Sequence, residues 1–154
     1  MVFFKITGGE LKPELEMSSS ATILELKEWI HERLNVEIAR QALFFDKIEL
    51  EDDRTIESYE FEDVEILGLV VTPVPEDPIY EILVKSTTAE ARIRVRETQK
   101  VVELRGKIER LWGIPTQYIS LSRHGIVMDD HHPLSAYYVN QGCTVVVKVI
   151  VNAR

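Results

Sequence analysis

The sequence is short of cysteine, glycine-rich loops and long apolar runs, and each shortage excludes a class of protein. A single cysteine, Cys143, among 154 residues excludes an internal disulfide framework and a cysteine-rich zinc module. It also predicts a reducing cytoplasmic or nuclear location. No apolar run approaches the roughly 20 residues that span a bilayer, so we expect no membrane partner. The N-terminus has no basic region followed by a small-residue cleavage site, which argues against a signal peptide.

Charge is divided unevenly along the chain. The formal net charge is −8. Residues 1–72 carry 7 Lys/Arg against 17 Asp/Glu, whereas residues 79–154 carry 11 Lys/Arg against 7 Asp/Glu. A change of sign between the halves is typical of two separate surfaces.

Proline is concentrated at one place. Three of the six prolines fall within residues 73–78. Because proline cannot donate to a sheet ladder and disfavours helix at the preceding residue, this stretch predicts a short, extended, semi-rigid linker. The chain therefore divides into a first domain at residues 1–72, a linker at 73–78 and a second domain at 79–154.

Both predicted domains repeat one order of elements. Each begins with two alternating strands, continues with an amphipathic helix and a short strand followed by an acidic turn, and ends with a β-branched strand. The strands are expected at residues 2–7, 11–17, 42–45 and 64–71, and again at 80–85, 91–95, 119–122 and 144–151. This ββαββ order predicts an α+β fold class, with two β-grasp domains in tandem.

The helices are indicated by apolar stripes and by their ends. The stripes recur at helical spacing and consist of Ile23, Leu26, Ile30 and Leu34, then Val101, Leu104, Ile108 and Leu111. Thr22 with Glu25 has the spacing of a capping box at the start of the first helix. Gly113, followed by Pro115, is a stop signal for the second helix.

Specific motifs then resemble those of ubiquitin. In the first domain they are Thr22-Ile23-x-x-x-Lys27-x-x-Ile30, Gln41-x-Leu43-x-Phe45, Leu50-Glu-Asp52-x-Arg54-Thr55-Ile56-x-x-Tyr59 and Leu67-x-Leu69-Val70. The second domain resembles ubiquitin more loosely, through Lys107-Ile108, Gly113-Ile114-Pro115, Leu121, Gly125, Asp130, Pro133-Leu134-x-x-Tyr137 and Val145-x-Val147. The chain is thus similar to tandem ubiquitin-like proteins over nearly its whole length outside the linker.

The resemblance assigns structural roles to several polar residues. It implies that a basic residue of each helix pairs with an aspartate of the acidic turn, as Lys27 with Asp52 and Arg105 with Asp130. It also implies that the hydroxyl groups of two buried tyrosines, Tyr59 and Tyr137, bond to backbone in a turn.

The resemblance also implies a receptor-binding face on the first domain. Strand alternation and the family pattern together predict that an apolar patch points outward, made of Phe4, Ile6, Phe44, Gly68 and Val70. This reading makes Phe3 core-facing and leaves Lys5 as an irregularity in the strand. Contiguous exposed apolar surface usually marks an interface. The alternatives are that the patch packs against the second domain or is merely solvated.

The same face of the second domain is expected to be basic. Arg92, Arg94 and Arg96 alternate along one strand, so a period of two places them on one side. By the resemblance, Lys85, Ser122 and Lys148 share that side. The cluster indicates an anionic partner, although an ordinary solvated face remains the alternative. No aromatic residues interleave with the arginines and the whole chain is acidic, which argues against nucleic acid.

The ends of the domains bear on the mode of action. Family members that are conjugated end in Gly-Gly, because only glycine lets other backbones approach so closely. The sequence ends in Arg154, and residue 72 leads into proline. We therefore expect a non-conjugated binding protein whose partners are ubiquitin receptors, proteasome subunits, ligases or deubiquitinases. The alternative is a divergent conjugated modifier whose mature end is not represented.

A third hypothesis is an enzyme that acts through Cys143 and a histidine. The only zinc-like set in the second domain consists of Cys143 with His124, His131 and His132, and it lacks ligand spacing. A nucleophilic cysteine needs a paired base in an electropositive environment. We expect no catalytic site, no metal and no cofactor, and a small packing role for Cys143.

Overall fold

The computed structural model describes residues 1–150. The chain forms two compact units, Met1–Pro73 and Val74–Arg154, called domain 1 and domain 2 below. The boundary between the two units, after Pro73, falls within the predicted linker 73–78. Val151, which was predicted to end the last strand, lies outside the described residues, as do 152–154.

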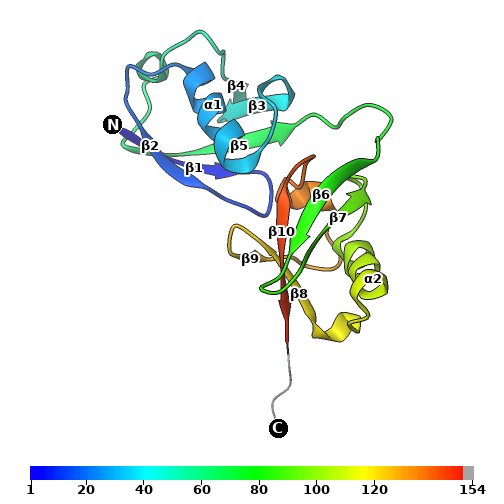
Figure 1. The fold of residues 1–154 in the computed structure, drawn as a ribbon. Coiled ribbons are helices and arrows are strands. Elements are labelled where there is room, and N and C mark those ends of the chain that lie inside the picture. The colour runs from blue at the N-terminus through cyan, green and yellow to red at the C-terminus, as the bar shows by residue number, and fades with distance from the viewer. Residues whose placement is uncertain (151–154) are drawn as a thin grey trace. The chain divides into compact units, whose positions relative to one another are not determined.

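Domain 1 is one helix against a mixed sheet (Figure 1). Its strands are β1 (Val2–Thr7), β2 (Glu14–Met17), β3 (Gln41–Phe45), β4 (Ile48–Glu49) and β5 (Val64–Val71), with α1 at Ile23–Leu34 and short helices η1 (Ile38–Arg40) and η2 (Ile56–Tyr59). The strand order is β2-β1-β5-β3-β4. The first and last strands, β1 and β5, run parallel at its centre, and the other pairs are antiparallel.

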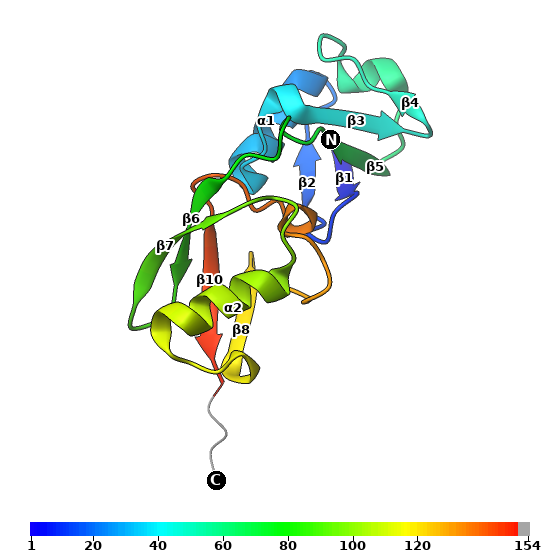
Figure 2. The ribbon, with the colours of Figure 1, turned by 90° about the vertical axis from the view of Figure 1, so that its right-hand side faces the viewer.

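Domain 2 repeats this arrangement, with α2 lying across its sheet (Figure 2). Its strands are β6 (Tyr80–Lys85), β7 (Glu90–Val95), β8 (Ile119–Arg123), β9 (Ile126–Val127) and β10 (Thr144–Val149), with α2 at Val101–Trp112 and short helices η3 (Thr116–Tyr118) and η4 (Leu134–Tyr137). The order is β7-β6-β10-β8-β9, and β6 and β10 are parallel. The prediction of an α+β fold with two β-grasp domains in tandem is confirmed.

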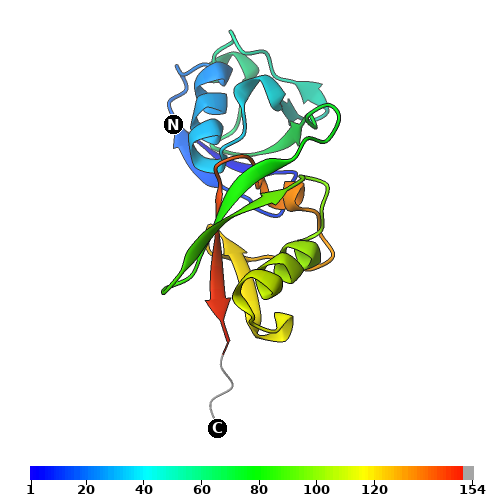
Figure 3. The same ribbon diagram turned by 45° about the vertical axis from the view of Figure 1, so that its right-hand side comes forward.

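Each helix covers one face of its own sheet (Figure 3), and its ends follow the sequence signals. The Thr22 hydroxyl accepts the Glu25 N–H at 3.2 Å at the start of α1. Gly113 ends α2 with φ +70°, a conformation that costs glycine little. The predicted stripes are buried except for Leu111, whose side chain is 52% exposed. Leu111 lies in the helix as predicted, but its side chain is exposed because α2 makes its buried contacts through Val101, Leu104 and Ile108.

An ion pair ties each helix to the acidic turn of its domain, as the resemblance implied. Lys27 Nζ lies 2.6 Å from Asp52 Oδ1, and Arg105 Nη1 lies 2.6 Å from Asp130 Oδ2. The Lys27 side chain is only 7% exposed, so Asp52 neutralises a cation that has little access to water. Arg105 Nη2 also donates to the Thr116 carbonyl.

Two tyrosine hydroxyl groups hold the same turns from the other side. Tyr59 Oη accepts the Glu51 N–H at 2.7 Å, and Tyr137 Oη accepts the Asp129 N–H at 2.8 Å. Tyr137 is buried, as expected, whereas Tyr59 is half-buried with the Arg54 guanidinium 4.0 Å above its ring. The hydrogen bonds implied by the resemblance are therefore present in both domains.

The proline-rich segment is bound to the domains on both sides of Pro73. Arg40 Nε donates to the Thr72 carbonyl at 2.7 Å within domain 1. The Val74 N–H donates to Oε1 of the buried Glu97 at 3.0 Å within domain 2, and the Thr98 hydroxyl donates to Asp77. Residues from Val74 onward thus belong structurally to domain 2 and do not act as a free spacer.

The Lys27–Asp52 pair should contribute measurably to the stability of domain 1. Replacing Asp52 with Asn leaves a nearly buried ammonium group without its counter-ion. We expect the free energy of unfolding to fall by about 1–3 kcal/mol, since Asp52 itself is half exposed. Urea unfolding followed through Trp29 tests this. Asp53→Asn removes the same charge from an exposed neighbour and should change the free energy by less than about 0.5 kcal/mol; equal effects of the two variants would contradict the assignment.

The contact between Val74 and Glu97 predicts that domain 2 needs the residues before β6. A fragment of residues 79–154 removes the Val74 donor from a buried carboxylate. It should unfold with a free energy about 1–3 kcal/mol below that of a 74–154 fragment, as expected for a hydrogen bond to a charged group. Urea unfolding followed through Trp112 measures the difference. Identical midpoints and slopes would show that the segment is only a linker.

Candidate protein-binding surfaces

The strand register of domain 1 determines which side chains leave its sheet on the face opposite α1. Lys5 pairs with Ile66 and Phe3 with Val64 across the parallel strands. Phe44 pairs with Gly68 across β3 and β5. Because paired residues point to the same face, these side chains lie together on the outer face of the sheet.

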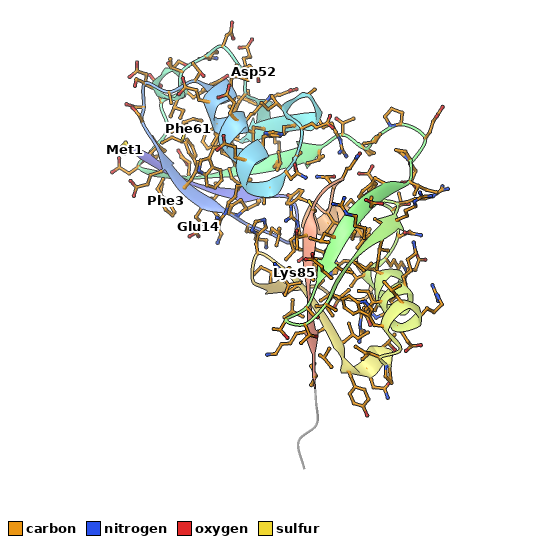
Figure 4. The ribbon with its side chains drawn as sticks, viewed as in Figure 1. Met1, Phe3, Glu14, Asp52, Phe61 and Lys85 are labelled. Carbon is orange, nitrogen blue, oxygen red and sulfur yellow. The ribbon has the colours of Figure 1, made fainter. Side chains whose placement is uncertain are left out.

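An apolar stripe runs along this outer face, and it consists of Phe3, Val64, Ile66, Gly68, Val70 and Phe44. Val64 is 62% exposed, Ile66 61% and Val70 55%, and both phenylalanines are half-buried. Figure 4 shows Phe3 and Glu14 on the side of the sheet away from α1, with Phe61 on the helix side. Exposed aliphatic side chains in one continuous row are the usual mark of an interface.

Two predicted members of the patch are instead in the core. Phe4 and Ile6 are both 0% exposed, and the Phe4 ring meets the Phe61 ring edge to face at 5.3 Å. The prediction placed them outward by treating Lys5 as an irregularity. Strict alternation from Lys5, the only charged residue of β1, gives the observed arrangement, with Phe4 and Ile6 buried.

Three members of the stripe, Phe3, Val64 and Ile66, were not predicted. Phe3 follows from the corrected alternation of β1. Val64 and Ile66 have the same parity as Gly68 and Val70 in β5, so the pattern that predicted the latter pair could have found them as well. Phe44, Gly68 and Val70 lie on the outer face where they were predicted.

The rim of the apolar stripe is acidic. Glu14 and Glu16 of β2 stand opposite Lys5 and Phe3, and Glu49 of β4 stands opposite Phe44. All three glutamates are exposed. Lys5 adds a single positive charge beside these three negative charges. A partner with basic groups around an apolar centre would therefore complement this face.

Domain 2 has the same registers with different side chains. Lys85 pairs with Val146, and Val146 pairs with Ser122, as Thr7 pairs with Gly68 and Gly68 with Phe44. The registers therefore equate Phe44 with Ser122, Gly68 with Val146 and Val70 with Lys148. The aromatic residue at the centre of the stripe has no counterpart in domain 2.

The charges on the neighbouring edge strand are reversed between the domains. Arg92 and Arg94 of β7 occupy the register positions of Glu14 and Glu16. Arg92 is exposed, and its Nη1 lies 3.3 Å from Glu81 Oε1. Arg94 is also exposed, and it is the cross-strand partner of Glu81 in the register. Both arginines lie on the outer face, as predicted.

Arg96 is exposed and lies one residue beyond the end of this row. It follows the end of β7, and its N–H donates to Gln99 Oε1 at 3.0 Å. Burial lowers the pKa of Lys107 in α2, Glu103 opposes this, and the positive charges of Arg110 and Arg96 lower the pKa further. Arg96 lies beyond the last register pair of β7, Tyr80 with Val95, so its place on the outer face stays a prediction.

Cys143 lies in a buried backbone turn. It is 5% exposed, its Sγ lies 3.6 Å from the Tyr138 carbonyl oxygen, and it accepts the Asn140 N–H at 3.3 Å. Arg123 is buried nearby and donates to the carbonyls of Tyr137 and Tyr138. Burial lowers the pKa of Arg123. The contacts assign a packing role to Cys143.

Within residues 1–150, no cluster of three or more His, Cys, Asp or Glu side chains is arranged to hold a metal ion. His124 and His131 are exposed, and His132 contacts the ring of Tyr137. No helix of the described chain combines the length and apolar character needed to cross a bilayer.

The fold and the two outer faces define a tandem β-grasp protein. The sequence profile of the Ubiquitin family matches residues 2–74 and 82–150, and the chain belongs to this family. It is 33% identical over 72 residues to the Ubiquitin domain-containing protein DSK2 of Saccharomyces cerevisiae, a match that covers 46% of this chain and 19% of that protein. The chain thus spans about a fifth of the curated relative that it matches.

The corrected alternation of β1 predicts that truncating two adjacent phenylalanines destabilises domain 1 to very different extents. Phe4→Ala should lower the free energy of unfolding by about 3–5 kcal/mol, because it opens a cavity beside Phe61. Phe3→Ala should lower it by about 1 kcal/mol or less, since the ring is half-buried on the outer face. Urea unfolding of the two variants through Trp29 fluorescence provides the comparison. A larger loss for Phe3→Ala would restore the original assignment of the strand.

Proposed function

We propose that the protein is a non-conjugated tandem ubiquitin-like binding module. Domain 1 would present its apolar stripe to receptors of the ubiquitin pathway, such as ubiquitin receptors, proteasome subunits, ligases or deubiquitinases. The observation that carries this proposal is the exposure of Val64, Ile66 and Val70 in one row on the sheet face opposite α1. Recognition, not catalysis, is the proposed activity, in the cytoplasm or the nucleus.

The centre of the stripe has the shape of a small docking site. Phe44 is half-buried, and its cross-strand partner is Gly68, which has no side chain. A Cβ atom built on Gly68 would meet nothing closer than the Phe44 carbonyl oxygen at 3.9 Å. The space above Gly68 is therefore open, and an apolar side chain of a partner could lie there against the Phe44 ring.

The acidic rim supports selectivity more than affinity. Glu14, Glu16 and Glu49 surround the stripe and are exposed. Exposed charges change the rate of association and exclude partners of like charge, while the buried apolar centre contributes most of the binding energy. We infer that the receptor carries an apolar anchor with basic residues around it.

Domain 2 would take a different partner from domain 1. It has Ser122 where domain 1 has Phe44, and Lys148 where domain 1 has Val70. Arg92 and Arg94 add positive charge to the same face. These substitutions support a division of labour in which domain 1 binds the ubiquitin-type receptor and domain 2 binds an anionic protein surface.

The proposal predicts that truncating Phe44 weakens receptor binding without unfolding domain 1. A panel of isolated ubiquitin-binding domains is immobilised, and the affinity of the full chain is measured by titration calorimetry for any that capture it. Phe44→Ala should weaken such binding by about 1–3 kcal/mol, the cost of losing an aromatic anchor. The amide spectrum of the variant shows whether the domain remains folded.

Ser122→Ala is the matched control, because Ser122 occupies the same register position in domain 2. It should leave the affinity unchanged. Equal binding by the Phe44→Ala and wild-type chains would refute the proposed surface. Failure of every domain in the panel to capture the wild-type chain would refute the receptor class.

A further inference from the structure

The last strand of domain 2 extends past the strand beside it. β6 ends at Lys85, whose partner in the register is Val146, and β10 continues to Val149. On its other edge β10 pairs with β8 up to Val149 and Ile119, and the Ile150 N–H donates to the Tyr118 carbonyl at 2.7 Å. The segment 147–149 is therefore held as a strand along one edge, and its register includes no partner from β6 along the other.

Domain 1 closes the equivalent edge with a glycine. Gly8 follows Thr7, the last residue of β1, and has φ +128°. A Cβ atom at Gly8 would lie 2.2 Å from the Leu69 carbonyl oxygen, so the backbone of the hairpin rests directly against β5. A residue with a side chain would be strained at this φ, and its Cβ atom would clash with the Leu69 carbonyl oxygen.

Domain 2 has Ser86 at the position of Gly8, so its hairpin cannot make the same approach. The Ser86 N–H donates to the Ala89 carbonyl at 2.8 Å, which closes a tight hairpin instead. The Ser86 hydroxyl oxygen accepts the N–H groups of Thr88 and Ala89 at 3.3 and 3.0 Å. These bonds fix the turn within itself and leave the edge of β10 uncovered.

A hollow of about 840 Å³ results between this hairpin and the end of β10. Its lining consists of Lys85, Ser86, Thr87, Thr88, Val146, Val147, Lys148 and Val149. Val146 is 48% exposed on the outer face of β10 and Val149 is 39% exposed on the other face, so the strand offers apolar surface on both sides. Lys85, labelled in Figure 4, and Lys148 are exposed and form no ion pair with another described residue.

We propose that this hollow binds an extended acidic and aliphatic segment of another protein, which adds as a strand to the free edge of β10. Backbone hydrogen bonds to residues 147–149 would give affinity, as in other cases of strand addition. Because side chains alternate along a strand, the aliphatic side chains of the segment would share the face of Val149. Its carboxylates would point to the other face, where Lys85 and Lys148 lie beside Val146 and supply the complementary charge.

This inference rests on the anionic partner proposed for domain 2 and is independent of the function proposed for domain 1. The test uses the full chain and a fluorescein-labelled peptide of sequence Glu-Val-Glu-Val-Glu-Val, with binding followed by fluorescence anisotropy. Amide spectra of the ¹⁵N-labelled chain locate the site. We expect the amide signals of 86–88 and 147–149 to shift, and the affinity to fall as salt concentration rises.

Charge-reversal variants distinguish peptide binding in the hollow from general electrostatic attraction to the chain. Lys148→Glu and Lys85→Glu should each weaken binding roughly three- to tenfold. Lys100→Glu makes the same change in net charge at an exposed position outside the hollow, and it should alter binding less than about twofold. Phe44→Ala should leave peptide binding unchanged, which separates this result from that for domain 1.

Variants of the peptide test the strand and the charge separately. A peptide with lysine in place of glutamate should not bind, and one with proline at its central valine should bind at least about tenfold more weakly, because proline cannot donate to the new ladder. Equal binding of the lysine peptide or of the proline peptide would overturn the proposal. So would shifts confined to residues outside the hollow, or full competition by a single-stranded oligonucleotide of equal charge.

Discussion

The parallel pairing of the first and last strands is the constraint on which each domain depends. β1 pairs with β5, and β6 pairs with β10, at the centre of their sheets. A parallel connection requires a crossover, and α1 and α2 provide it and cover one face of the sheet. Because side chains alternate with a period of two, a slip of one residue in this pairing would exchange the core and the outer face. The pairing of Thr7 with Gly68 in domain 1, and of Lys85 with Val146 in domain 2, therefore determines which side chains form the outer face of each sheet.

The two domains show how one register can carry two recognition surfaces. Core positions are fixed by packing, and so Ile23, Leu26 and Ile30 in α1 have apolar counterparts in α2. Outer positions are limited only by solvation and strand propensity, so they can differ freely. At these positions glutamates are replaced by arginines on the edge strand, and Phe44 is replaced by Ser122. The same backbone thus presents an acidic rim around an apolar stripe in one domain and a mainly basic face in the other.

Elements with local signals could be predicted from the sequence, and features that depend on neighbouring segments could not. Thr22 and Gly113 marked helix ends because capping is a local matter of backbone groups. The predicted phase of β1 was wrong because a strand with one charged residue offers little contrast between its two faces, and because the prediction treated Lys5 as an irregularity. Periodicity placed Leu111 in the correct helix, but it could not show that this side chain is exposed, because it gives the face of a helix and not the extent of the sheet beneath it. The bond between Val74 and Glu97 joins residues that are distant in sequence, and no local pattern of the linker indicates it.

Lysines at the open edge of β10 also explain how domain 2 can leave a strand edge uncovered. An uncovered edge is a template for pairing with other chains, and natural sheets often guard such edges with lysine. Lys85 and Lys148 repel any strand that carries like charge at the matching positions, which includes β10 of a second copy. A strand with carboxylates at those positions meets no such repulsion. The residues that protect the edge from self-association therefore also select the partner, and Ser86, at the register position of Gly8, leaves the edge open to such a strand.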